Sequence, residues 1–281
     1  MIFSSRAAFG FISILPWISF TFAALSSPSL AGALSKNCTQ GFRHSGAATG
    51  KNVTIAGVQT YLAEPTHPSG TKKVIFFYSD AFGPFVINNQ LLQDYFASRG
   101  RYYVLGLDYF FGDPIGLHVD KDLQPIDPNF NLTAWVEKSR REAAQAVPIW
   151  NEAVKKRYGR NAKYNAVGYC FGALYSVGIG ATDEVVATAF AHPAELTEAH
   201  FTNLTKPILL SCAETDEAFP TADRNQAVDL LTQNNKTYHY QVFSGTEHGF
   251  ATRGDPNDPN AVWAMKESAR SVAGWFDRFS N

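Results

Sequence analysis

The stretch Gly168-Tyr169-Cys170-Phe171-Gly172 decides the fold, because it joins a short apolar strand to a helix. The residues before it, 164–167, read Tyr-Asn-Ala-Val, and those after it, 173–179, read Ala-Leu-Tyr-Ser-Val-Gly-Ile. This order is typical of a nucleophile elbow, a sharp turn that presents a reactive side chain. The two flanking glycines let the backbone pass tightly, and the helix N-terminus favours a thiolate at Cys170. The motif alone leaves a second interpretation open, a buried structural cysteine beside a glycine turn.

Outside this stretch, short apolar runs alternate with helical segments. A hairpin is expected over 52–63, and buried strands are expected over 74–78, 102–107, 164–169, 185–190, 207–212 and 238–243. Helices are expected over 88–98, 133–158 (kinked at Pro148), 222–232 and 259–279. This alternation predicts an α/β fold, a mostly parallel central sheet of about eight strands with helices on both faces. The length of 281 residues suits one large core.

The first 31 residues have the features of a secretory signal peptide. Arg6 precedes an apolar run over 7–25 that Pro16 interrupts, and small residues follow over 26–33. Cleavage is expected after Ala31, with a cut nearer Ala24 as the alternative, which leaves one domain over 32–281. A membrane anchor is the other interpretation, but Pro16 and the small residues disfavour it.

Glycosylation sequons also favour export. N-x-S/T occurs at Asn37, Asn52, Asn131, Asn203 and Asn235. Five sequons behind a signal peptide predict a secreted, extracellular glycoprotein. The mature chain is expected to work away from membranes, as a monomer.

Charge and motifs exclude several classes of ligand. The net charge is −1, so there is no electrostatic basis for binding nucleic acid or an anionic membrane surface. No glycine-rich phosphate loop follows a strand, and the histidines share no ligand spacing with cysteine or acidic residues. No cofactor and no metal are therefore expected, and the partner is a small molecule.

The cysteine count is odd. Of Cys38, Cys170 and Cys212, at least one must be a free thiol or pair with another chain. If Cys170 is a nucleophile, Cys38 and Cys212 could form a disulfide, or Cys212 could be a buried small residue at the end of a strand. A redox role for Cys170 is disfavoured because no second cysteine lies close to it in the sequence.

A nucleophile, an acid and a histidine follow successive strands. Cys170 comes after one strand, Asp216 after the next but one, and His248 after the last. Because ligands bind at the carboxyl ends of parallel strands, these side chains are expected to meet. His248 would act as general base and Asp216 would orient it, with Glu214 and Glu217 as fallback acids.

These motifs resemble one family, the dienelactone hydrolases, a Cys-His-Asp branch of the α/β-hydrolase fold. Residues 168–172 look like its elbow, and residues 248–250 followed by Arg253 look like its histidine loop. Ser-Asp-Ala-Phe-Gly at 79–83 and Tyr-Phe-Phe-Gly-Asp-Pro at 109–114 resemble two of its strand-end loops. The resemblance spans residues 38–279, nearly all of the mature chain.

The resemblance implies a role for each matching residue. Cys170 would attack an ester or lactone carbonyl to give an acyl-enzyme, and the amides of Ala81 and Phe171 would form the oxyanion hole. Asp80 would replace a carboxylate, usually Glu, that assists the thiol. Arg253 would bind a substrate carboxylate.

The loop at 109–114 departs from the family pattern. Phe111 stands where relatives often have a second arginine, so Phe111 and Tyr109 are expected to give a more aromatic, less polar substrate pocket. Arg253 could instead be a surface partner of Asp255. The departure also keeps open a second function, a secreted binding protein that has the hydrolase scaffold without turnover.

Overall fold

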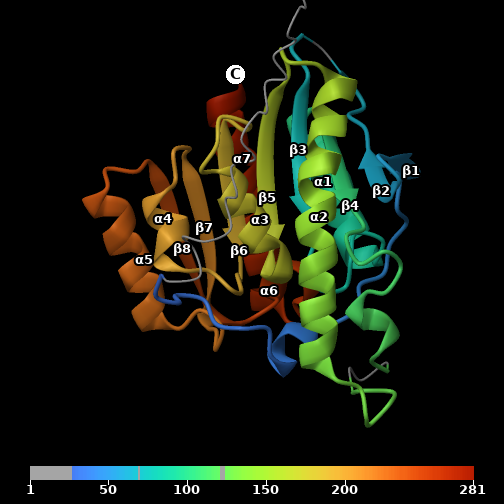
Figure 1. Ribbon diagram of the computed structural model, residues 1–281, viewed down its shortest axis with the longest axis vertical. Helices are drawn as coiled ribbons and strands as arrows, with labels where there is room; N and C mark the ends of the chain where they lie inside the picture. Colours follow the sequence, from blue (N-terminus) through green and yellow to red (C-terminus); the bar gives the residue numbers. More distant parts are fainter. Residues whose placement is uncertain (1–26, 69, 121–123) are drawn as a thin grey trace, which may run out of the picture.

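One sheet runs through the whole structure, a computed structural model that describes residues 27–68, 70–120 and 124–281. Its strands are β1 (Lys51–Ile55), β2 (Val58–Ala63), β3 (Lys73–Tyr78), β4 (Tyr102–Leu107), β5 (Lys163–Tyr169), β6 (Ala187–Ala191), β7 (Ile208–Thr215) and β8 (Tyr238–Glu247). They lie in the order β1-β2-β4-β3-β5-β6-β7-β8 (Figure 1). Strand β2 pairs antiparallel with both β1 and β4, and the other pairings in this sheet are parallel.

Helices connect the strands. The α-helices are α1 (Ile87–Gly100), α2 (Leu132–Tyr158), α3 (Ala173–Ile179), α4 (Glu198–Thr202), α5 (Thr221–Gln233), α6 (Phe250–Arg253) and α7 (Pro259–Ser280). Short 3-10 turns in the described residues are η2 (Lys36–Thr39), η3 (Ile115–Leu117) and η4 (Cys170–Gly172). None of the helices in the described ranges is both long and apolar enough to cross a bilayer.

Side chains alternate between the two faces of the sheet, as in β3. Ile75 and Phe77 pack in one core with α1 and α7. Val74, Phe76 and Tyr78, which point to the other face, pack in a second core with Trp150 of α2. Strands buried on both faces read as continuous apolar runs, which is why β3 shows no polar alternation. In Figure 1, α2 crosses the near face of the sheet and α7 lies behind it.

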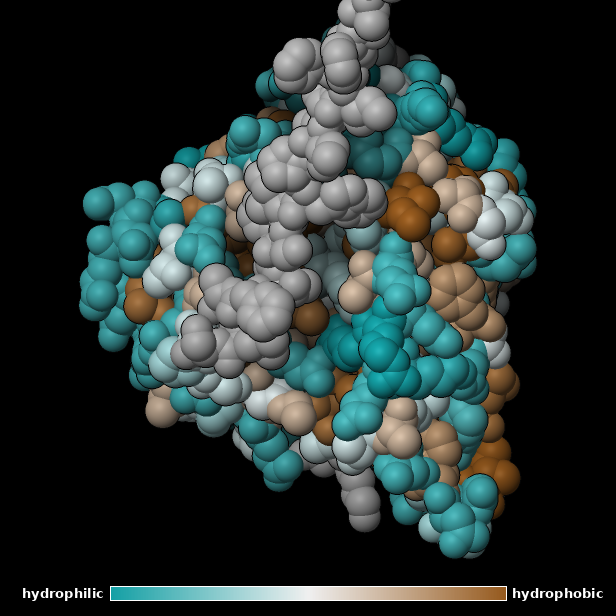
Figure 2. All heavy atoms as spheres, in the orientation of Figure 1, coloured by the Kyte–Doolittle hydropathy of each residue, from teal (hydrophilic) through white to brown (hydrophobic). Residues whose placement is uncertain are grey.

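The helices on the near face are amphipathic. The buried side of α2 carries Trp135, Ala143, Trp150 and Val154 at helical spacing. The outer surface along α2 and α5 is mostly hydrophilic (Figure 2). Helix α2 continues through Pro148 without a break, although the sequence predicted a kink at that residue.

The predicted α/β-hydrolase fold is confirmed, and most strands begin and end within a few residues of their expected positions. The sequence missed α4 and α6, which are only one turn long. Short helices give too few residues to establish a 3.6-residue period, so the sequence signal is weak there.

An N-terminal arm, residues 27–50, lies across the carboxyl ends of the strands, where the blue segment runs in Figure 1. Leu30 N donates to Leu196 O at 2.8 Å, and Gly32 N donates to Ala218 O at 2.6 Å. Farther along, Phe42 N donates to Arg253 O at 2.9 Å. The arm therefore touches the loops that follow β6, β7 and β8.

The start of the arm bears on the predicted signal cleavage. Residues 1–26 lie outside the described residues, but Leu30 and Ala31 are buried in the core beside α3 and α5. A cut after Ala31 would remove these contacts. A cut nearer Ala24, the alternative from the sequence, would keep them.

Candidate active site

The elbow is as tight as the sequence predicted. Cys170 has a φ of +47°, in the left-handed region that side chains rarely adopt. A Cβ on Gly168 would lie 2.4 Å from Gly172 O, and a Cβ on Gly172 would lie 2.1 Å from Tyr78 O. Only glycine fits at these two positions, because a methyl group would overlap backbone atoms that cannot move away. The elbow is thereby pressed against the end of β3.

Arg140 of α2 contacts the elbow through Phe171. The Arg140 guanidinium carbon lies 3.5 Å from the centre of the Phe171 ring, and Nη1 donates to Phe171 O at 2.8 Å. Arg140 also pairs with Glu195. The sequence analysis missed this support, because an arginine inside an amphipathic helix gives no signal of its own.

His248 and Asp216 form a buried pair. His248 Nδ1 donates to both carboxylate oxygens of Asp216, at 2.9 and 3.0 Å. The backbone amides of Ala218 and Phe219 donate to Asp216 Oδ1 at 2.9 and 3.2 Å, which fixes the carboxylate. The Nε2 atom of His248 is thus turned away from the carboxylate, toward the elbow.

The fallback acids lie elsewhere. Glu214 accepts hydrogen bonds from Gly245 N at 2.7 Å and Ser244 Oγ at 3.2 Å, so it fixes the loop before His248. Glu217 is exposed. Of the three carboxylates in this loop, the structure places Asp216 against the histidine.

Cys38 lies in the site, which the sequence did not predict. Its Sγ atom is 3.4 Å from His248 Nε2. The ligand-forming atoms of Cys38, Cys170 and His248 all lie within 4.8 Å of one another. All three cysteines are free and buried, and Cys212 packs in the core beside α3 and α5. The disulfide considered between Cys38 and Cys212 is therefore wrong.

The protons of the two thiols are distributed unequally. The hydrogen bond from Cys170, together with the nearby imidazolium, holds the pKa of Cys38 well below its usual range. Burial raises the pKa of the Cys170 thiol, and Cys38 raises it further. Burial of His248 opposes its protonation, but Cys38 and Asp216 raise its pKa to about 9. These directions favour a thiolate on Cys38, whereas the sequence favoured one on Cys170.

A second histidine adjoins this group. His192 is fully buried, and within the described part of the chain neither ring nitrogen has a hydrogen-bond partner. Its ring centre lies 5.1 Å from that of His248. Burial, and then the charges of His248 and Arg253, keep the pKa of His192 well below its ordinary value, so this imidazole is neutral.

Arg253 binds inside the protein. Its guanidinium pairs with Asp80, and Nε and Nη2 donate to the carbonyls of Gln40 at 2.7 Å and Cys38 at 3.1 Å. Gly41 and Gly249 make room for it, since a Cβ on either would lie within 2.6 Å of the Arg253 side chain. Both earlier expectations for Arg253, a substrate ligand or a surface partner of Asp255, differ from this arrangement. A buried cation needs a fixed counter-charge, and Asp80 supplies it.

Asp80 is likewise fully engaged. Thr252 Oγ1 donates to Oδ2 at 2.9 Å, and Asn89 Nδ2 donates to Oδ1 at 2.9 Å. None of the hydrogen bonds found for this carboxylate in the described ranges reaches the Cys170 thiol. The predicted direct assistance to the thiol is therefore not what the structure shows, and Asp80 acts on the site through Arg253.

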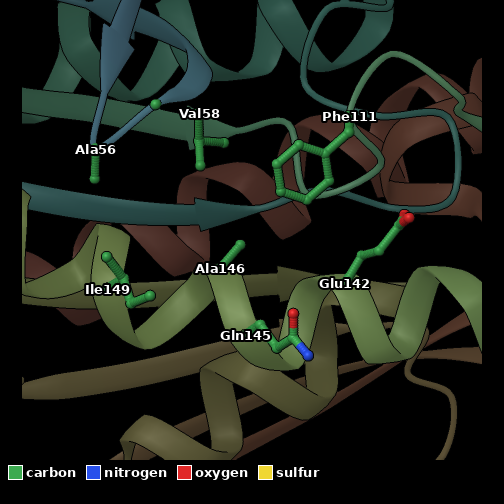
Figure 3. Close-up of a pocket in the computed structure, with 8 residues that line it drawn as sticks. Ala56, Val58, Phe111, Glu142, Gln145, Ala146 and Ile149 are labelled. Atoms are coloured by element: carbon green, nitrogen blue, oxygen red, sulfur yellow. The ribbon is translucent and has the colours of Figure 1, made fainter.

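Tyr109 and Phe111 do not line the space beside His248. Tyr109 is fully buried, its hydroxyl donates to Ser79 O, and its ring packs against Phe171. Phe111 points into a separate pocket of about 410 Å³, between the β1–β2 hairpin and α2 (Figure 3). Its ring there faces Val58 and Ala146 (Figure 3). Neither ring therefore lines the cleft beside His248, where the sequence expected both to shape the substrate pocket.

A cleft of about 730 Å³ opens beside His248. It is lined by arm residues 40–43, by the loop 245–250 and by Arg253. Cys170 is itself fully buried beneath the arm. The two predicted oxyanion donors are held nearby, Ala81 in the loop after β3 and Phe171 in the elbow that presses on the end of β3.

Comparison with known proteins agrees with this geometry. The sequence model of the dienelactone hydrolase family matches residues 58–280. Dienlactone hydrolase 2 of Gibberella moniliformis is 36% identical over 243 residues, which is 85% of this chain and 92% of that protein. Hydrolase tropI of Talaromyces stipitatus is 28% identical over 86% of this chain and 95% of its own length. The chain belongs to the dienelactone hydrolase family, and it is a hydrolase.

Solved structures show the same fold. A dienelactone hydrolase from Anabaena variabilis matches with a TM-score of 0.56 at 14% identity, covering 85% of this chain and all of that one. Carboxyl esterase 2 of Tuber melanosporum matches with a TM-score of 0.57 at 13% identity, covering 86% of this chain and 91% of that one. At this identity the likeness concerns the fold alone.

The close approach at the elbow can be tested through stability. We expect Gly172→Ala to lower the free energy of unfolding by at least about 1–3 kcal/mol, the range for overpacked sites, because its Cβ would meet Tyr78 O. Gly178→Ala, on the helix that follows, has no atom within 4 Å of its new Cβ and should change stability by less than about 1 kcal/mol. Urea unfolding measures both. Equal effects would contradict the packing described.

The position of Phe111 predicts the result of restoring the family's arginine. A cation added to a substrate clamp should favour an anionic lactone by about 1.5–3 kcal/mol, a change in kcat/KM of roughly 10- to 150-fold. Because Phe111 faces another pocket, we expect Phe111→Arg to leave the ratio of kcat/KM for carboxylate-bearing and neutral lactones unchanged. A tenfold gain for the anionic lactone would show that this loop does reach the substrate.

Proposed function

We propose that the protein hydrolyses a small ester or lactone through a Cys170-His248-Asp216 triad and an acyl-enzyme. The observation that carries this is the buried His248–Asp216 pair beside a thiol on a positive-φ elbow. Asp216 occupies Nδ1, so Nε2 is the atom that exchanges a proton at the elbow.

Each step has a residue to perform it. The Cys170 thiol passes its proton to the Cys38 sulfur, and the Cys170 sulfur attacks the carbonyl carbon. The carbonyl electrons move to oxygen, where the amides of Ala81 and Phe171 would donate hydrogen bonds. Collapse of this intermediate breaks the bond to the alkoxide, which takes a proton from His248 and leaves a thioester.

The second half of the cycle returns the thiol. His248 Nε2 takes a proton from water, and the hydroxide attacks the thioester carbonyl. The carbon–sulfur bond breaks, the acid leaves, and Cys170 regains its proton from Cys38. Asp216 stays ionised throughout and stabilises the imidazolium each time it forms.

Substrate enters through the cleft beside His248. Its walls combine polar backbone of residues 245–249 with Phe42 and Phe250, which suits a small, partly apolar molecule. The fungal relatives named as dienlactone hydrolases support a lactone as substrate class. Arg253 is paired with Asp80, but Arg43 of the arm also lines this wall and is exposed, so both neutral and carboxylate-bearing esters or lactones are candidate substrates.

The triad is tested with short aryl esters. We expect Cys170→Ala to abolish acyl-enzyme formation, and His248→Ala to lower kcat/KM by about 10²- to 10⁴-fold, the usual worth of a general base. Asp216→Asn should also lower kcat/KM, because the amide no longer fixes the proton on Nδ1 of His248. Mass spectrometry of the acylated protein identifies the thiol that carries the acyl group.

Cys212→Ala is the control, because it also removes a buried thiol but lies away from the site. Acylation on Cys38 in the Cys170→Ala protein would move the nucleophile to Cys38. An inert wild type with no acylation would leave the alternative, a binding protein on a hydrolase scaffold.

We also propose that the protein is secreted as a glycoprotein. Four of the sequon asparagines are exposed: Asn52, Asn131, Asn203 and Asn235. A glycan attached at any of them would not disturb the core. The buried contacts of Leu30 and Ala31 support a cut upstream of them, nearer Ala24.

Expression of the full chain in a secreting yeast tests this. We expect the protein in the medium, an N-terminus that precedes Ser29 by Edman sequencing, and a loss of apparent mass on treatment with an N-glycosidase. The Asn203→Gln variant should differ from the wild type by at most one glycan. Retention inside the cell without glycan would contradict the proposal.

A further inference from the structure

Cys38, Cys170 and His248 make a second arrangement beyond the triad. They come from the N-terminal arm, the elbow and the loop after β8, and their ligand-forming atoms lie within 4.8 Å of one another. Their residues are only 1%, 0% and 8% exposed. Two thiols and an imidazole facing one another in a buried space are the donor set of a soft or borderline metal ion.

The distances suit a tetrahedral ion. With bonds of about 2.3 Å to sulfur and about 2.0 Å to nitrogen, two ligands of a tetrahedral zinc ion lie roughly 3.5 Å apart. Cys38 Sγ and His248 Nε2 are already 3.4 Å apart. An ion between the three groups therefore requires small side-chain movements and no rearrangement of the elbow.

The surroundings hold two of the ligands in place. His248 directs Nε2 at the thiols because Asp216 occupies Nδ1, the carboxylate–histidine arrangement that orients imidazole ligands of metals. The carbonyl of Cys38 accepts a hydrogen bond from Arg253 Nη2 at 3.1 Å, which fixes the arm at that residue. The site is pre-organised before any ion binds.

The local charge also favours a cation. The charges of Arg253 and Asp80 act on the pKa of Cys170 in opposite directions, and the carboxylate of Asp216 contacts His248 directly. Two thiolates next to it would repel each other in a buried space. A divalent ion compensates them, and the cleft beside His248 provides a path of entry.

We propose that Cys38, Cys170 and His248 form a three-ligand site for a soft divalent cation of the Zn²⁺ or Cd²⁺ class, and that the bound ion blocks Cys170. Binding forms two metal–sulfur bonds and one metal–nitrogen bond and releases two protons from the Cys38–Cys170–His248 group. The binding does not depend on the proposed function, whereas the inhibition rests on it.

The binding is tested on the reduced full chain with Cd²⁺ alone. We expect the ultraviolet cadmium–thiolate band to saturate at one ion per chain. Loss of a residue that only hydrogen-bonds to a metal ligand costs about 10- to 100-fold in affinity, so Asp216→Asn should weaken Cd²⁺ binding by that factor. Cys38→Ser removes a ligand itself and should weaken Cd²⁺ binding at least about 100-fold. Circular dichroism checks that each variant is folded.

Cys212→Ala is the matched control, since it removes the one cysteine outside the group and should keep the full band. A band lost in Cys212→Ala but kept in Cys38→Ser would overturn the site. So would the absence of a saturable band in the wild type. Co²⁺, whose visible spectrum reports tetrahedral sulfur coordination, gives a second reading of the same variants.

The inhibition is tested separately with Zn²⁺. One equivalent should abolish hydrolysis of short aryl esters, and a chelator should restore it. Any hydrolysis left in Cys38→Ser should resist the same Zn²⁺ concentration. A protein that binds Cd²⁺ but never hydrolyses esters would contradict the proposed function and support the site. Hydrolysis that Zn²⁺ leaves unchanged, despite a saturated cadmium band, would overturn the inhibition.

Discussion

The buried ion pair between Arg253 and Asp80 holds the site together. Asp80 follows the central strand β3 and Arg253 ends the short helix after the last strand, so the pair joins loops from the middle and the edge of the sheet. The same guanidinium binds the backbone of the arm at Cys38 and Gln40. Removing either charge would leave the other buried without a partner, which is far more costly than losing an exposed pair.

This pair changes what the family resemblance means for this chain. In the resemblance, the carboxylate served the thiol and the arginine served the substrate. Here each neutralises the other, and both position the arm. The thiol at 3.4 Å from His248 Nε2 is that of Cys38, a residue outside the part of the chain that the family sequence model matches.

The sequence predicted what is local or periodic. The strands followed from continuous apolar runs, and the elbow followed from two glycines that the structure shows to be sterically required. Asp216 and His248 followed from the rule that strand ends meet. Cys38 could not be found in this way, because it belongs to no strand end and its contact with His248 spans 210 positions. A redox role was disfavoured because no second cysteine lies near Cys170 in the sequence, and a metal site because the histidines share no ligand spacing. Both arguments use distance along the sequence, whereas the arm folds back onto the site.

The arm also sets the order in which the protein is assembled. Its hydrogen bonds to the loop after β8 join positions more than 200 apart, so they form only after nearly the whole chain has been made. Contacts this distant carry the largest loop-closure cost and come late in folding. A chain that ends before the loop after β8 therefore contains the elbow but lacks His248 and Arg253, with which the arm makes its contacts. The candidate site is complete only once the loop after β8 has been made.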